Sequence, residues 1–186
     1  MKFIALLIGV LISVSSNALV IDTNAGWDGN TNLGWFGSGQ SLTVDNTENT
    51  FGDIGFYFDT ASNGKTFDFK LSDALNGGTT LFSTSFVVNS AGINVIDIGL
   101  SLTGGSTVWA LMDYKGFNGS TAHFSYTDSY GGGNSMFGPF DTMTNYANAD
   151  HRFIANFSGT SVPEPASLAL LALGLAGLGF SRRKAS

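Results

Sequence analysis

The 186-residue sequence predicts an all-β domain, an antiparallel β-sandwich of the jelly-roll kind, with a targeting segment at each end. Short stretches of the chain alternate apolar and polar residues with a period of two, as half-buried strands do. Gly- and Asn-rich turn signals separate these stretches. No stretch has the 3.6-residue period of an amphipathic helix, so the middle of the chain is expected to consist of strands and turns.

The N-terminus has the parts of a secretory signal peptide. Lys2 precedes an apolar run over residues 3–14, and small residues lead up to Ala18. We expect residues 1–18 to be a signal peptide that a signal peptidase cuts after Ala18, so that the mature chain begins at Leu19. The sequence has no cysteine, which excludes disulfides, thiol catalysis and thiolate metal ligands.

The body of the chain, residues 19–161, is long enough for one β-sandwich ectodomain with its own core. Phe67, Phe69 and Leu71 alternate with charged residues, so their side chains share the buried face of one strand. The same alternation predicts strands at residues 41–45, 54–60, 67–71, 81–88, 96–102, 108–114, 122–126 and 152–157. Turns are predicted at Asn63-Gly64, Asn76-Gly77-Gly78, Gly104-Gly105 and Asn118-Gly119. The phenylalanines expected in the core are Phe67, Phe69, Phe124, Phe153 and Phe157.

The body is strongly acidic. The formal net charge of the whole chain is −6, but the targeting segments carry half of the basic residues. Between Asp22 and Glu164, fourteen acidic residues face only four basic ones, which gives −10. This charge argues against nucleic acids and anionic lipids as partners.

Two stretches do not alternate, residues 22–40 and 128–150, and long irregular loops of this kind are often functional. Strands that return to the same end of a sandwich bring such loops together. Flat aromatic rings can stack on the apolar faces of sugars, while Asn and Asp bond to the hydroxyls. The platform predicted on this basis comprises Trp27, Trp35, Tyr130 and Tyr146, with Asp28 and Asn134 as polar neighbours. The alternative is that these aromatic residues cover the open ends of the core.

Asp22, Asn24 and Asp28 are candidate calcium ligands, because Ca²⁺ prefers oxygen donors and these residues alternate with others along one loop. An EF-hand requires Gly at the sixth position and Glu at the twelfth. Counted from Asp22 or from Asp28, those positions hold other residues. Asx-turns in a polar loop explain the pattern more simply, and no other cofactor is predicted.

Catalytic constellations are missing from the sequence. A glycosidase needs paired carboxylates, yet the two glutamates are Glu48 and Glu164, and Glu164 lies in the C-terminal targeting segment. The sequence has no Gly-x-Ser-x-Gly motif that would make His123 or His151 part of a hydrolase triad, and the spacing of the two histidines is not that of a zinc site. The sequence predicts a non-catalytic exported module. The alternative is a secreted glycan-active enzyme on a jelly-roll scaffold.

The C-terminal segment, residues 162–186, has three parts. Two prolines favour an extended, exposed stalk, and the apolar run 166–180 follows. As a helix this run spans roughly 22 Å, which is shorter than a hydrocarbon core of about 30 Å. A short transmembrane helix of this kind suits a transient anchor, and basic residues would hold its end in the cytoplasm. The motif residues are Val162, Pro163, Glu164 and Pro165, and the basic residues are Arg182, Arg183 and Lys184.

This segment resembles the PEP-CTERM sorting signal of Gram-negative bacteria, which consists of a Pro-Glu-Pro motif, one hydrophobic helix and a basic tail. The resemblance implies that an exosortase, an intramembrane cysteine enzyme, recognises the Pro-Glu-Pro region and then releases or transfers the protein. It also implies a transient inner-membrane anchor, later placement at the cell surface or in the extracellular matrix, and association with exopolysaccharide and biofilm. The alternative is a plain C-terminal anchor.

Overall fold

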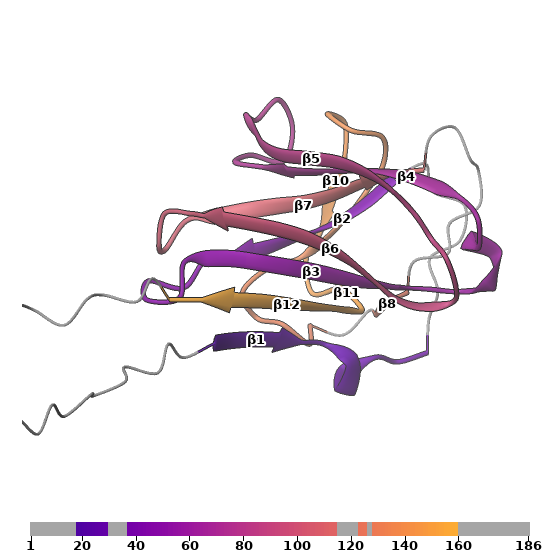
Figure 1. Ribbon diagram of the computed structural model, residues 1–186, viewed down its shortest axis with the longest axis horizontal. Coiled ribbons are helices and arrows are strands. Elements are labelled where there is room, and N and C mark those ends of the chain that lie inside the picture. Colours follow the sequence, from indigo (N-terminus) through magenta and orange to yellow (C-terminus); the bar gives the residue numbers. More distant parts are fainter. Residues whose placement is uncertain (1–17, 30–36, 115–122, 126–127, 160–186) are drawn as a thin grey trace, which may run out of the picture. The chain divides into compact units, whose positions relative to one another are not determined.

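The structure, a computed structural model, describes residues 18–29, 37–114, 123–125 and 128–159 (Figure 1). Two antiparallel sheets form two layers. The four-stranded sheet has the order β1 (Ala18–Asp22), β12 (Phe153–Ser158), β3 (Thr50–Phe58) and β6 (Gly92–Ser101).

The six-stranded sheet carries the groove described below. Its order is β10 (Thr144–Tyr146), β9 (Ser135–Phe137), β2 (Gly37–Thr43), β7 (Thr107–Asp113), β4 (Thr66–Ser72) and β5 (Thr80–Val87). Two further short strands, β8 (Phe124–Ser125) and β11 (Asp150–His151), pair with each other. Among the described residues, the helices are single 3₁₀ turns, η1 (Asn24–Gly26) and η2 (Thr60–Ser62). Within the described ranges no helix has the length and apolar character to cross a membrane.

The prediction of an all-β antiparallel sandwich is confirmed. Seven of the expected strands correspond to β2–β7 and β12, and part of the eighth corresponds to β8. The strands β1, β9, β10 and β11 were not predicted. Each has five residues or fewer, and β9–β11 lie in a stretch rich in Gly and Asn, where a period of two cannot be recognised.

The main core lies between the two sheets. Phe67 and Phe69 point into it from β4, and Phe153 and Phe157 point into it from β12, all with 0–1 % of their surface exposed. Phe157 stacks on Phe51 of β3 with ring centroids 4.4 Å apart. The expected burial of these four phenylalanines is confirmed. The side chain of Phe124, the fifth residue expected in the core, is not among those that the structure describes.

A second, smaller apolar cluster covers the outer face of the six-stranded sheet. It exists because β7 is apolar on both faces: Val108, Ala110 and Met112 enter the main core, whereas Leu111 is fully buried on the opposite side. We call this cluster the ridge; its residues are Leu75, Trp109, Leu111, Met136, Phe140 and Met143.

Both ends of the described unit lie at the same end of the four-stranded sheet. Ala18 at the start of β1 pairs with Ser158 at the end of β12 (Figure 1). Residues 17–159 form one compact unit. The predicted signal peptide lies outside the described residues except for Ala18, and the sorting segment lies entirely outside them; the boundaries after Ala18 and near Val162 stay predictions. Cleavage after Ala18 would leave residues 19–22 of β1 paired with β12.

Candidate functional site

The two irregular loops meet, as the sequence led us to expect. Gly26, the last residue of η1, lies so close to Ser129 that a β-carbon at Gly26 would collide with the Ser129 side chain. Trp27 and Asp28 therefore lie near the start of the second loop. Trp35 lies outside the described residues.

Trp27 belongs to a cluster around Arg152 that we call the Arg152 clasp. The guanidinium carbon lies 4.3 Å from the Trp27 ring centroid and 4.0 Å from that of Tyr57. Its Nε donates to Asn24 Oδ1 at 2.7 Å, its Nη2 donates to the same oxygen, and its Nη1 donates to His123 Nδ1 at 3.2 Å. The His123 ring stacks on Trp27 at 4.6 Å. Burial, with Arg152 as a second cause, lowers the pKa of His123, which therefore remains the neutral acceptor in this cluster.

Tyr130 and Tyr146 occupy other surroundings. The half-buried Tyr130 ring meets Phe153 edge-on at 5.9 Å, and its hydroxyl accepts from the Thr43 backbone N–H at 3.1 Å. Tyr130 thus covers the core between the sheets. Tyr146 is 36 % exposed and meets Phe137 edge-on at 5.2 Å. Each of the three described aromatic residues of the predicted platform packs against a different partner.

The groove lies on the outer face of the six-stranded sheet, between β2, β7 and the segment that follows Asp128. Its volume is about 360 Å³. Asn134, one of the two polar neighbours that the sequence predicted for the platform, is among the residues that line it, whereas the other, Asp28, is not among the described lining residues. The described residues that line it are Ser41, Thr43, Thr107, Trp109, Asp128, Gly131–Gly133, Asn134 and Asn145.

Backbone and side-chain hydrogen bonds fix one wall of the groove to β2. Asn134 donates its backbone N–H to Ser41 Oγ at 2.8 Å, and Thr43 Oγ1 donates to the Gly132 carbonyl at 2.7 Å. Gly133 lies directly against the Ser41 carbonyl, where no β-carbon would fit. Trp109 pairs with Ser41 across the strands and presents a half-buried indole to the groove.

A buried polar network supports the start of this wall. The Asp150 carboxylate, with 0 % exposure, accepts from Gln40 Nε2 at 2.8 Å and from the Tyr130 backbone N–H at 2.7 Å. Burial raises the pKa of Asp150. The Gln40 side-chain carbonyl accepts the backbone N–H of His151 at 2.9 Å. The network therefore ties β2, β11 and the loop before Gly131 together.

His151 is a structural residue of the core. It is 1 % exposed, lies between Phe56 and Phe137, and donates from Nδ1 to the His123 carbonyl at 3.3 Å. Burial lowers its pKa to about 4. His151 is not among the described residues that line the groove.

The candidate calcium ligands are engaged within the protein. Asp22 Oδ1 accepts the Asn24 backbone N–H at 2.8 Å, which is the Asx-turn geometry, and Asn24 Oδ1 accepts from Arg152. Among the residues that the structure describes, no group of three or more His, Asp or Glu side chains is placed to hold a metal ion. Calcium binding at Asp22, Asn24 and Asp28 stays a prediction.

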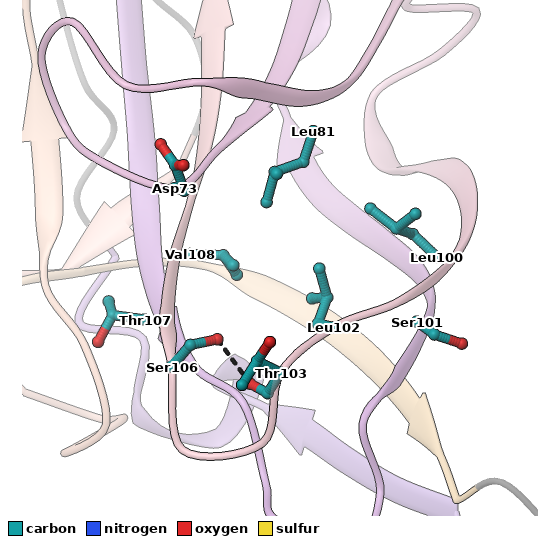
Figure 2. Close-up of a pocket in the computed structure, with 9 residues that line it drawn as sticks. All are labelled: Asp73, Leu81, Leu100, Ser101, Leu102, Thr103, Ser106, Thr107 and Val108. Carbon is teal, nitrogen blue, oxygen red and sulfur yellow. Dashed lines mark hydrogen bonds between the residues drawn. The ribbon is translucent and has the colours of Figure 1, made fainter.

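A different hollow, of about 400 Å³, opens between the sheets (Figure 2). Leu81, Leu100 and Leu102 form its walls, and the Ser106 hydroxyl closes one side by donating to the Thr103 carbonyl at 2.6 Å. These leucines pack against the main core. The apolar side of the hollow is therefore a gap at the edge of the core.

The sorting segment decides the identification. A family model described as the PEP-CTERM protein-sorting motif matches residues 161–184. The chain carries a PEP-CTERM sorting motif. The motif implies that an exosortase processes the chain and that the protein is exported to the cell surface or the extracellular space.

The sandwich of this PEP-CTERM protein is similar to part of a solved structure, the clostridial cysteine protease Cwp84 after propeptide cleavage. The TM-score is 0.56 at 13 % sequence identity, and the match covers 77 % of this chain and 40 % of that one. At this identity the likeness concerns the fold alone. No curated protein matches the chain in sequence.

The residues that the sequence predicted for the site include Asn134, which lines the groove, but not Trp109, which lines it as well. The tryptophan lies in the strand predicted at residues 108–114, whose faces the sequence pattern does not assign. Alternation gave no clear signal, because the face that carries Trp109 also carries Thr107, Leu111 and Asp113 and so mixes polar and apolar residues.

Proposed function

We propose that this exported protein is a non-catalytic component of the cell surface or extracellular matrix, and that its sandwich binds an extracellular polysaccharide in the groove beside Trp109. The observation that carries this proposal is the composition of the groove. A half-buried indole lies among the hydroxyl and amide side chains of Thr43, Asn134 and Asn145. An aromatic surface flanked by a few polar groups suits a sugar ring, which has apolar C–H faces and a rim of hydroxyls.

The charge of the groove favours hydroxyl-rich ligands over anions. Among the described residues that line it, Asp128 is the only charged one. The surrounding body is acidic as well. Nucleic acids and anionic lipid surfaces would be repelled, whereas a neutral polymer would not.

Three features support a non-catalytic role. His151 and Asp150 are buried and serve the fold. His123 is stacked on Trp27 and bonded to Arg152 in the clasp. The carboxylate at the groove, Asp128, has no second carboxylate beside it in the lining.

The membrane anchor belongs to the same proposal. The short apolar run before Arg182 would hold the chain in the inner membrane of a Gram-negative bacterium until the exosortase acts. Binding to exopolysaccharide would then keep the released protein in the biofilm matrix. Sorting supplies the location, and the groove supplies retention there.

The test is binding to the exopolysaccharide of the producing organism. Full-length protein in mild detergent is incubated with the immobilised polymer, and Trp109→Ala is compared with Trp27→Ala. We expect Trp109→Ala to weaken binding about tenfold, a loss of about 1.4 kcal/mol, and Trp27→Ala to bind like the parent. Equal binding by the parent and Trp109→Ala contradicts the groove as the site. Release of reducing sugar from the polymer contradicts the non-catalytic role.

A further inference from the structure

A second hollow, of about 410 Å³, lies on the same outer face of the six-stranded sheet as the groove. Asp68 and Lys70 line it from β4, Ser83 and Ser85 line it from β5, and Phe140 lines it from the segment before β10. It repeats the chemistry of the groove, since one half-buried aromatic ring is set among hydroxyl-bearing side chains.

The ridge separates the second hollow from the groove. Leu111 at its centre pairs with Lys70 on the neighbouring strand, so the ridge stands between the two hollows. Trp109 belongs to both the ridge and the groove, and Phe140 belongs to both the ridge and the second hollow. The two aromatic residues therefore mark the two flanks of one continuous apolar surface.

The spacing of the hollows follows from the strand register. Ser85 pairs with Asp68, and Asp68 pairs with Asp113, four residues along β7 from Trp109. Two strand spacings across and four residues along give a separation of roughly 16 Å between Trp109 and Ser85. That distance exceeds the length of one sugar ring, so only a chain of several sugars could reach both hollows.

We infer that the second hollow is a further subsite for the same polysaccharide chain, which would run from Trp109 across the ridge to Phe140. This inference rests on the proposed function. Lys70 would donate to sugar hydroxyls here, and Ser83, which is exposed, would exchange hydrogen bonds with them. Two weak subsites on one chain raise its affinity without any stronger single contact.

The ridge is held in place before any ligand arrives. Asn76 forms a pair of hydrogen bonds with the Met143 backbone, at 3.1 Å to the carbonyl and 3.0 Å from the N–H. Lys70 Nζ forms an ion pair with Asp141 at 3.1 Å and lies 4.8 Å from the Phe140 ring centroid. A surface fixed in this way needs little ordering on binding, so shallow contacts suffice.

The experiment measures affinity against chain length. The probes are short and long oligosaccharides made by partial hydrolysis of the producing organism's exopolysaccharide, titrated into full-length protein in mild detergent. Phe140→Leu keeps the apolar contact with the ridge and removes the flat ring. Ser83→Gln fills the hollow with a neutral side chain and leaves the ridge untouched. Ser90→Gln, at an exposed serine outside both hollows, is the matched control.

We expect Phe140→Leu and Ser83→Gln to weaken the binding of long fragments about five- to tenfold and to leave the affinity of the groove for short fragments unchanged. Trp109→Ala should weaken the binding of both long and short fragments. If Phe140→Leu and Ser83→Gln bind long fragments with the affinity of the parent, the second subsite is overturned. It is also overturned if the two variants lose affinity equally for short and long fragments. If the parent binds no fragment and no polymer, the proposed function itself fails, and the subsite fails with it.

Discussion

His151 connects a single buried side chain to the pH dependence of stability. Its pKa is about 4 in the folded protein and 6.5 when exposed, because burial disfavours the imidazolium. The unfolded chain therefore binds a proton that the folded chain does not, and stability is lost as pH falls from 6.5 towards 4. This loss amounts to about 3 kcal/mol.

Urea unfolding at pH 7 and pH 4.5 tests this expectation. The neutral variant His151→Gln should show a much flatter pH dependence over that range than the parent. Asp150 acts in the opposite direction, since its raised pKa lets the folded state take up a proton first. Parallel pH profiles for the parent and His151→Gln would show that His151 is not the titrating group.

Phe69 tests the packing of the main core. It is 1 % exposed and lies edge-on to Phe82 of β5 at 6.2 Å. Phe69→Ala should lower the free energy of unfolding by about 3–5 kcal/mol, because it leaves a cavity between the sheets. Val95→Ala, at a side chain 55 % exposed, should change it by less than about 0.5 kcal/mol. Similar losses for the two variants would contradict the assigned faces.

Among elements, the Arg152 clasp joins η1 and Trp27 to the rest of the sandwich. It joins Asn24 and Trp27 of the first loop to Tyr57 of β3 and to His123. Arg152→Lys keeps the charge but removes the planar fork that bonds Asn24 and lies close to the Trp27 and Tyr57 rings. We expect a loss of about 1–3 kcal/mol and faster hydrogen exchange over residues 22–27. Unchanged exchange there would mean that the clasp is not what orders the loop.

The elements also show what the sequence could predict. Strands such as β4 bury one face only, so Phe67, Phe69 and Leu71 reveal them through alternation. In β7 both faces are covered, and alternation alone could not tell that Trp109 lies on the groove side. The short strand β9 owes its position to pairing with β2, a non-local contact that leaves no pattern in its own three residues.

The candidate site was harder to predict than the fold, for a similar reason. The convergence of the two loops followed from sandwich topology, and Gly26 does lie against Ser129. The partner of each aromatic side chain depends on residues distant in sequence, such as Arg152 for Trp27 and Phe153 for Tyr130. Loop composition alone could not show whether these rings would share a surface.

At the scale of the whole molecule, the sorting segment predicts a change in covalent structure. We expect the mature protein to lack residues 168–186, because a short apolar run behind a Pro-Glu-Pro stalk makes a poor permanent anchor. Mass spectrometry of the surface fraction would show the new C-terminus, and replacing Pro163 and Pro165 by Ala should leave uncut protein in the membrane fraction. A mature chain that still ends at Ser186 would rule out this processing.

Retention in the matrix tests the central claim most directly, because it depends on both sorting and binding. The parent and Trp109→Ala are produced in the native organism, and the share of each protein in the extracellular matrix is measured against the share in the culture fluid. Both should be exported and processed alike, while Trp109→Ala should be shed into the fluid because its groove no longer holds the polymer. An equal share of parent and variant in the matrix would contradict the account.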